Sequence, residues 1–481
     1  MSTRRDRHDS RPRRDIPRPG LRLLPTLRAV SLAVLAVALW ILGDVTALAA
    51  PRALAAGLLI ALLLGFALIL PAAIRLRPKR QVRDSDVPVG GVLSVQLELP
   101  AGAPAGLLPL GRGAVRAHLP EALGGTGDLS LTRRMPHRLP VRRRGVHALG
   151  PLTVAIRDPL GLFHLRRTLH DDAQVTALPA VEEVSAPAAR AAGIAMEGSH
   201  SAPPSPGAGE MGPIPRPYAP GDDIRRIHWK ASARTGRLMT REEEPQAPRV
   251  AVILLDTRPV GPGSEPQGTG SARRAPGEGQ RALDDQLALE DRLVEITASL
   301  LLALSAHGWQ VRVLDASGDE ITRCDRTRSG GVIGGAGHDG VIGREADALG
   351  RRSALHGLAA VGFEDTEPLQ GGEAGAGSTA LLIAVGPAPL PGPDGAAREP
   401  LEGLDVDRCA GRAARRIAIA VRCDPDGESA GRNRADGDAA VEPQPGESPA
   451  PEASRRGPWI LVRARTAHPL SDILQAIGEV R

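Results

Sequence analysis

Lysine, cysteine and aromatic residues are scarce in this sequence, and each shortage argues against a class of protein. Of the 60 basic residues, only Lys79 and Lys230 are lysines. The three cysteines, Cys324, Cys409 and Cys423, form no CxxC pair and lack zinc-ligand spacing. This argues against a disulfide framework and fits a reducing compartment. Aromatic residues make up 2 % of the chain and do not alternate with the arginines, which argues against binding of nucleic acid.

Recognisable catalytic motifs are also absent. The sequence has no GxSxG elbow, no P-loop, no HExxH pair and no GxGxxG between a strand and a helix. The glycines from Gly334 to Gly340 are more typical of a flexible loop than of a phosphate cradle. We therefore predict that the chain is not an enzyme.

The length of the chain and the distribution of its charge indicate a membrane protein with several domains. With 481 residues the chain is long enough for about three domains. Its net charge is +5, and much of the local positive charge lies at the N-terminus and just after the second of two apolar runs. That distribution fits a membrane protein better than a nucleic-acid-binding protein.

Two apolar runs within residues 27–75 predict a pair of transmembrane helices. The second run, Ala53 to Ile74, has 22 uncharged residues, more than the roughly 20 that cross a bilayer. The first, Leu27 to Leu48, is uncharged except near its ends, where Arg28 and Asp44 would lie at the two interfaces. The alternative is a cleaved signal peptide followed by a single helix.

The flanking arginines predict the orientation of this pair in the inner membrane. Residues 1–28 hold nine arginines, whereas the short link expected around Ala50 to Arg52 holds one. Five more basic residues follow the second helix: Arg75, Arg77, Lys79, Arg80 and Arg83. The positive-inside rule then places both termini in the cytoplasm. Residues 1–26 are basic and proline-rich, and we expect them to be disordered.

Residues 81–181 are predicted to form a small β-sandwich-like domain. Short segments such as Val92 to Leu99 alternate apolar and polar residues and are separated by glycine and proline. Residues 182–213, rich in Ala, Gly, Ser and Pro, are expected to be a linker.

Residues 248–481 are predicted to form an α/β domain with a mostly parallel sheet. Apolar strands such as Val250 to Leu255 alternate with helical patterns such as Leu283 to Ser305. Three segments rich in Gly, Pro, Ser and acidic residues interrupt the pattern: Pro259 to Gln280, Pro387 to Pro400 and Asp424 to Gly457. We interpret them as disordered insertions at loop tips.

One segment, residues 214–247, concentrates residue types that the rest of the chain avoids. It holds the single tyrosine, Tyr218, and one of the two lysines. A turn is expected at Pro220-Gly221, and Asp222 or Asp223 is expected to cap a short helix carrying Ile224, Ile227 and Trp229. Three interpretations remain open: a structural network of ion pairs, a binding surface for a protein or an anionic ligand, and a catalytic site built on Asp223, His228 and Ser232.

This segment closely resembles the signature of the bacterial domain-of-unknown-function 58 family. The matching positions are Tyr218, Pro220, Gly221, Asp222, Asp223, Arg225, Ile227, His228, Trp229, Lys230, Ser232, Ala233, Arg234, Gly236 and Leu238. Segments Arg143 to Pro151 and Arg157 to Phe163 also resemble that family, as does the order of the parts. The resemblance implies a von Willebrand factor A-like domain with a Rossmann-type parallel sheet, and association with a MoxR-type AAA+ ATPase.

The resemblance also raises the question of a metal ion. Von Willebrand factor A domains often bind Mg²⁺ through Asp-x-Ser-x-Ser after their first strand. Asp256 lies at that place, but Thr257 and Arg258 follow it and both serines are missing. We therefore expect no cofactor, with Asp256 a remnant of a metal site that caps a helix or pairs with a nearby arginine.

Three hypotheses for the function follow. The first is a membrane-anchored cytoplasmic interaction protein that works with a MoxR-type AAA+ ATPase in assembly or maturation at the envelope. The second is a hydrolase-like enzyme that uses the signature segment. The third is a membrane scaffold that self-associates through its β-rich domain.

Overall fold

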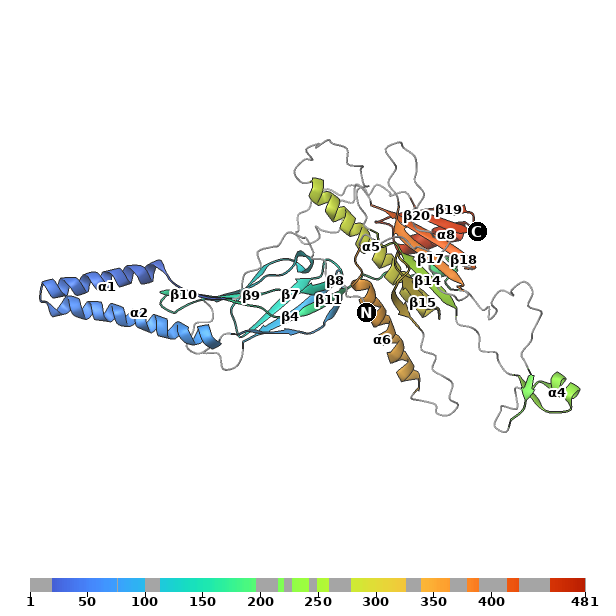
Figure 1. The fold of residues 1–481 in the computed structure, drawn as a ribbon, viewed down its shortest axis with the longest axis horizontal. Coiled ribbons are helices and arrows are strands. Elements are labelled where there is room, and N and C mark those ends of the chain that lie inside the picture. Colours follow the sequence, from blue (N-terminus) through green and yellow to red (C-terminus); the bar gives the residue numbers. More distant parts are fainter. Residues whose placement is uncertain are drawn as a thin grey trace, which may run out of the picture. The chain divides into compact units, whose positions relative to one another are not determined.

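The computed structural model divides the chain into two compact units (Figure 1). Unit 1 comprises Met1–Val181 and Leu355–Gly362, and unit 2 comprises Glu182–Ala354 and Phe363–Arg481. The structure describes residues 20–75, 77–99, 113–195, 215–219, 227–241, 249–258, 278–325, 339–363, 379–388, 413–423 and 450–480.

Unit 1 begins with two long apolar helices that form a hairpin. They are α1 (Leu27–Val45) and α2 (Ala49–Arg75). All of α1, and Ala49–Leu70 of α2, are long and apolar enough to cross a membrane. The predicted pair of apolar helices near the N-terminus is therefore confirmed, and both are candidate membrane spans.

The link between these helices lies earlier in the chain than predicted. It covers residues 46–48, so Pro51 and Arg52, which we expected in or beside the link, lie in the first turn of α2. Proline is tolerated there because the first N–H groups of a helix have no intrahelical acceptor. The Arg52 Nη2 donates to Asp44 Oδ1 at 2.8 Å, an ion pair at the hairpin tip that the sequence patterns do not indicate.

The β-rich part of unit 1 has three sheets around one core. The sheet orders are β1-β10-β9-β5-β6, β2-β4-β7 and β3-β11-β8. The strands are β1 (Gly20–Pro25), β2 (Lys79–Val82), β3 (Asp86–Pro88), β4 (Val92–Glu98), β5 (Gly113–Ala117), β6 (Gly127–Ser130), β7 (Arg134–Pro140), β8 (Gly145–Ala148), β9 (Leu152–Arg157), β10 (Phe163–Leu169) and β11 (Gln174–Leu178), with a short 3₁₀ helix η2 (Glu121–Leu123). Leu93, Ile156 and Val175, one from each sheet, are buried in this common core. The expected short strands are present, and they form three small sheets around one core.

The strand β1 corrects the prediction that residues 1–26 are disordered. Residues 20–25 pair antiparallel with every residue of β10 except the last one of that strand. At the end of β1, the Thr26 N–H donates to Leu162 O at 2.8 Å. The Thr26 hydroxyl accepts from Ala29 N, so Thr26 is the N-cap of α1. The sheet therefore continues directly into the first apolar helix. Residues 1–19 lie outside the described residues.

The second apolar helix packs on the same sheet. The rings of Phe66 in α2 and Phe163 in β10 meet edge to face, with centroids 5.7 Å apart. A Cβ placed on Gly65 would lie 3.2 Å from Asp158 Oδ2 in the β9–β10 turn, which is the close approach that glycine permits. The last turns of α2 therefore run beside β10 (Figure 1).

Unit 2 contains a seven-stranded sheet of order β16-β15-β14-β17-β18-β20-β19. Its strands are β14 (Val250–Leu255), β15 (Gln310–Leu314), β16 (Glu320–Cys324), β17 (Leu381–Pro387), β18 (Arg415–Arg422), β19 (Glu452–Arg456) and β20 (Trp459–Arg465). The central five are parallel to one another, and the edge strands β16 and β19 are antiparallel to their neighbours. The predicted mostly parallel sheet is thereby confirmed.

Edge strand β19 corrects a second prediction. It lies within Asp424 to Gly457, which we interpreted as a disordered insertion. Its sequence, Glu-Ala-Ser-Arg-Arg, has no apolar alternation, because an edge strand is held by backbone hydrogen bonds to β20 and leaves most of its side chains in water. The first of the three insertions also ends earlier than predicted, since helix α5 begins at Glu278.

The helices α5 (Glu278–Ala306) and α8 (Leu470–Glu479) pack on this sheet, and most of α6 (Asp339–Ala359) also belongs to unit 2. Leu293, Ile296 and Leu300 of α5 are fully buried, and α5 packs on β14, β15, β17 and β18. The last residues of α6 belong to unit 1, where His356 Nε2 lies 2.8 Å from Asp86 Oδ2.

Residues 182–195 correct the prediction of a linker over 182–213. They contain α3 (Ala186–Ala191), capped by the Ser185 hydroxyl, and α3 packs against α8. A Cβ on Gly478 of α8 would lie 2.7 Å from Ala191 Cβ, so small residues on both helices allow this close packing. An alanine-rich composition suggests a linker, but here it builds a helix that buries Ala188 and Ala189. Residues 196–214 lie outside the described residues.

Candidate functional site

The signature segment is described over residues 215–219 and 227–241. The predicted site residues Pro220, Gly221, Asp222, Asp223 and Arg225 lie outside the described residues, as does Ile224. The remaining predicted site residues are described, namely Tyr218, Ile227, His228, Trp229, Lys230, Ser232, Ala233, Arg234, Gly236 and Leu238.

The two ends of this segment lie side by side. Strands β12 (Pro215–Pro217) and β13 (Met239–Arg241) pair antiparallel. The Tyr218 N–H donates to Leu238 O at 2.8 Å, and Ile227 forms an isolated bridge with Thr240. The signature is therefore a small closed loop on a two-stranded base.

The described helix of this loop is α4 (Trp229–Thr235), with His228 as its N-cap. The predicted caps Asp222 and Asp223 lie outside the described residues. The His228 Nδ1 accepts from Ala231 N at 3.1 Å, as a capping side chain does. Ile227, which we expected inside the helix, is buried in extended backbone before it. At the other end, Gly236 adopts φ +68° and its N–H donates to Ser232 O, which terminates the helix.

The Ser232 hydroxyl and the Nδ1 atom of His228 are engaged with the backbone. The Ser232 hydroxyl donates to His228 O at 3.1 Å and accepts from Met239 N at 2.9 Å. The His228 Nδ1 accepts from Ala231 N, so the Ser232 hydroxyl is directed at the carbonyl of His228 and not at its ring. Both residues therefore act as parts of the frame that joins α4 to β13.

The same frame presents apolar and cationic side chains to solvent. Trp229 is 68 % exposed and Leu238 is 48 % exposed. Lys230 and Arg234 lie four residues apart on one helical face and are exposed, as is Arg237. We call Trp229, Lys230, Arg234, Arg237 and Leu238 the Trp229 surface. No acidic residue occurs in residues 215–219 or 227–241, so the described part of the signature is cationic.

Asp256 lies at the carboxyl end of β14, next to β17, where the strand order of the parallel sheet reverses. In open α/β sheets this is the place where ligands bind. The Asp256 carboxylate is 1 % exposed and is hydrogen-bonded to a nearby residue of the same chain. Arg258 Nε donates to Oδ1 at 2.8 Å and Nη2 donates to Oδ2 at 2.7 Å. The hydrogen bond to Asp256 raises the pKa of Arg258 above its ordinary value despite partial burial.

This geometry does not fit a Mg²⁺ ion at Asp256. The guanidinium of Arg258 covers both carboxylate oxygens, and the Thr257 hydroxyl accepts from Ala316 N at 3.4 Å. Among the residues that the structure describes, no three His, Cys, Asp or Glu side chains are grouped to hold a metal ion. A guanidinium of the same chain therefore neutralises the Asp256 carboxylate, and the predicted pairing of Asp256 with an arginine is confirmed.

Replacing Arg258 by methionine should destabilise unit 2, because it leaves a buried carboxylate without a cation. We expect a loss of about 3 kcal/mol in the free energy of unfolding, at the low end for buried pairs since Arg258 is partly exposed. Asp256→Asn should lower the free energy of unfolding by less than the Arg258 variant does, because the guanidinium left behind reaches water. Thermal unfolding of the full chain in detergent measures both. A rise in the wild-type melting temperature on adding Mg²⁺, absent in Asp256→Asn, would contradict this assignment.

The signature lies in a region that is similar to a known protein family. The model of a family described as "Protein of unknown function DUF58" matches residues 215–275. No curated protein and no solved structure matches this chain. The matched range contains the loop of α4, the strand β14 and the Asp256–Arg258 pair. The resemblance noted in the sequence is thereby confirmed for residues 215–275, which match the model of the domain of unknown function 58.

Proposed function

We propose that this chain is a membrane-anchored interaction protein that docks a partner through the Trp229 surface. The observation that carries the proposal is the geometry of α4. The polar side chains of His228 and Ser232 fix the loop from within, while Trp229 stands exposed at the first helical position. Exposed tryptophans held on a rigid frame are typical of residues that dominate binding energy in interfaces.

The proposed anchor is the hairpin of α1 and α2. Support comes from their length and apolar character, and from the nine arginines of residues 1–28. Basic residues also follow α2, whereas Arg52 at the hairpin tip pairs with Asp44. By the positive-inside rule, this distribution supports an inner-membrane hairpin with both termini in the cytoplasm.

We further propose that unit 2 is von Willebrand factor A-like. Without β19, the six strands of its seven-stranded sheet, numbered along the chain, lie in the order 3-2-1-4-5-6, with the third antiparallel. Asp256 follows the first strand, at the position expected from the resemblance. The partner that the resemblance implies for such a domain is a MoxR-type AAA+ ATPase. Its docking site would have to be acidic and apolar to match the cationic Trp229 surface.

A photo-crosslinking experiment tests this proposal. A photoreactive amino acid at position 229 of the full chain, expressed in its native membrane, should crosslink to an AAA+ ATPase. Trp229→Ala should weaken co-purification of that ATPase by about 30-fold, equivalent to about 2 kcal/mol for a residue that dominates an interface. The fold should be unaffected, because the side chain is mostly in water.

Leu349→Ala is the matched control for this variant. Leu349 is also 68 % exposed and lies on α6, outside the signature. It should bind the partner as the wild type does. Equal losses for Leu349→Ala and Trp229→Ala would mean that the Trp229 surface has no special role. Crosslinks from position 229 to a second copy of this chain would replace the proposal with self-association.

A further inference from the structure

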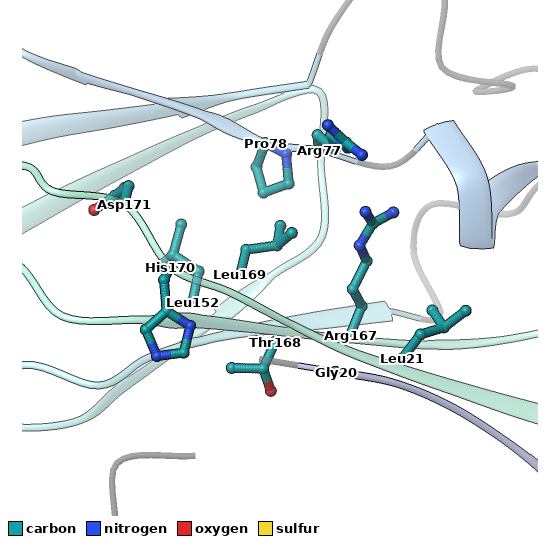
Figure 2. Close-up of a pocket in the computed structure, with 10 residues that line it drawn as sticks. All are labelled: Gly20, Leu21, Arg77, Pro78, Leu152, Arg167, Thr168, Leu169, His170 and Asp171. Carbon is teal, nitrogen blue, oxygen red and sulfur yellow. The ribbon is translucent and has the colours of Figure 1, made fainter. Parts of the chain in front are cut away.

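A cavity of about 730 Å³ lies in unit 1, where β10 meets the chain that follows α2 (Figure 2). Leu152, Leu169 and Pro78 give it apolar walls. The guanidinium groups of Arg77 and Arg167 point toward each other across it, from the segment after α2 and from β10 (Figure 2). The cavity thus combines apolar walls with two cations at one end.

The charge inside this cavity is predominantly positive. Asp171 is its acidic residue, and Asp171 Oδ1 accepts from Arg80 Nη1 at 2.7 Å. Burial, and after it the charge of Arg77, lower the pKa of Arg167 below its ordinary value. The like charges of Arg77 and Arg167 repel each other, and an anion between them would relieve that repulsion.

The height of the cavity along α2 can be derived from two contacts. Phe66 meets Phe163 at the start of β10, and Phe66 lies four residues, or about 6 Å, before the end of the apolar span at Leu70. Arg167 lies four strand residues beyond Phe163, or about 13 Å along β10. Because β10 runs beside α2, Arg167 lies about 7 Å beyond the end of the apolar span. The headgroup layer is roughly 5 to 8 Å thick, so this position falls within it.

Exposed leucines near the cavity support this position. Leu21 at its rim is 53 % exposed, and Leu24 further along β1 is 56 % exposed. Leu27 at the start of α1 and Leu160 in the β9–β10 turn are exposed as well. An edge strand with exposed leucines promotes aggregation in water, but it is stable against the acyl boundary of a bilayer.

We propose that this cavity binds the phosphate of an anionic phospholipid from the membrane face beside it, through Arg77 and Arg167. The proposal rests on the proposed membrane anchor. Arginine suits the role because its planar fork donates two parallel hydrogen bonds to phosphate oxygens. The apolar walls would take the glycerol and the first methylenes of the chains, and bound lipid would fix the sheet of β1 and β10 against the bilayer.

Native mass spectrometry of the full chain in nanodiscs tests the proposal. In mixed phosphatidylcholine and phosphatidylglycerol nanodiscs, the wild type should retain phosphatidylglycerol after ejection. Arg167→Gln should reduce that retention about tenfold, the loss expected for one charge-assisted contact. Arg77→Gln should have a similar effect, and because Arg77 is exposed its removal leaves the fold intact.

Arg166→Gln is the matched control. Arg166 is the neighbouring residue on β10, is exposed, and does not line the cavity, so this variant removes the same charge from the same strand. Equal losses for Arg166→Gln and Arg167→Gln would show that only the general positive charge attracts lipid, and would overturn the site. Displacement of the lipid by inorganic phosphate at similar concentration would overturn the assignment to lipid in favour of a soluble anion.

Failure of the anchor gives a different result. A wild type that is recovered in the soluble fraction, or that does not enter nanodiscs, would remove the proposed membrane anchor itself. A wild type that enters nanodiscs but retains phosphatidylcholine and phosphatidylglycerol equally would leave the anchor in place and remove only the lipid site.

Discussion

Gly150→Ala is expected to destabilise the β-rich part of unit 1 strongly. Gly150 follows β8 in a left-handed conformation with φ +63°. A Cβ at this position would lie 1.9 Å from the carbonyl oxygen of His118, far inside van der Waals contact. The chain after β5 and the chain before β9 cannot separate to make room, because His118 N donates to Pro151 O at 3.1 Å directly beside the clash.

The expected loss is about 4 kcal/mol, combining about 1 kcal/mol for a left-handed alanine with about 3 kcal/mol for overpacking against backbone. That is a large share of the stability of a domain of this size. Hydrogen exchange of the full chain in detergent should rise in peptides of β5, β8 and β9, while peptides of unit 2 stay protected.

Gly125→Ala separates the two causes. Gly125 has φ +81°, but a Cβ there would meet nothing within 4 Å. This control should therefore lose only the cost of the left-handed backbone, about 1 kcal/mol. If Gly125→Ala and Gly150→Ala were equally destabilised, the close approach to His118 would contribute nothing and the clash would be refuted.

Gly150 also gives a physical reason for part of the sequence resemblance. It lies in the segment Arg143 to Pro151, which resembles the family pattern, as does Gly145 with φ +127°. The Asp158 carboxylate in the second such segment accepts from Leu160 N and Phe163 N, and so shapes the turn beside α2. These segments therefore specify backbone geometry in unit 1, and no ligand is needed to explain them.

Local pattern predicted most of the fold in unit 2. The strand Val250–Leu255 has the predicted bounds, because a buried parallel strand is a continuous apolar run. The predictions failed where local pattern carries no signal. Strands β1 and β19 are edge strands with mixed composition, and α3 is a helix too short and too rich in alanine to be told from a linker.

The candidate site was predictable in its location and not in its geometry. The rarity of tyrosine, lysine and tryptophan singles out the signature, and the family match covers it. However, sequence preferences favour aspartate over histidine as an N-cap, so the role of His228 required the structure. The cavity of Arg77 and Arg167 was not predicted, because it joins residues ninety positions apart through the pairing of strands.

Arg292→Leu is the second substitution with a large expected effect. Arg292 of α5 is 8 % exposed and binds Glu182 through Nη1 and the carbonyl of His468 through Nη2. Nη1 also lies 3.0 Å from Glu295 Oε2. Burial lowers the pKa of Arg292, but the hydrogen bond to Glu182 and the charges of both carboxylates outweigh this and raise it.

Glu182 connects this ion pair to α8. Its second carboxylate oxygen accepts from Leu470 N at the start of α8, where Pro469 offers no capping side chain. Its own N–H donates to the Ser299 hydroxyl at 2.9 Å. One carboxylate therefore neutralises a buried arginine and caps a helix in place of the missing N-cap side chain.

Leucine at position 292 should leave Glu182 and Glu295 together without a cation. We expect the free energy of unfolding to fall by about 3 kcal/mol. This is less than for a fully buried pair, because both carboxylates are partly exposed. Hydrogen exchange should increase first in α3 and α8, which depend on Glu182 for their position. The melting temperature of unit 2 should fall by about 6 to 12 °C, the shift that this loss produces in a domain of 150 to 250 residues.

The double variant Arg292→Leu with Glu182→Gln decides whether the charge or the packing of Arg292 matters. Removing one partner of a buried ion pair is costly, whereas removing both charges is often close to neutral. Glutamine retains a carbonyl oxygen that accepts from Leu470 N, so the cap of α8 survives. We therefore expect the double variant to be more stable than Arg292→Leu alone. If it were less stable by the sum of the two single losses, the pair would be uncoupled, and Arg292 would stabilise unit 2 through its contact with the His468 carbonyl.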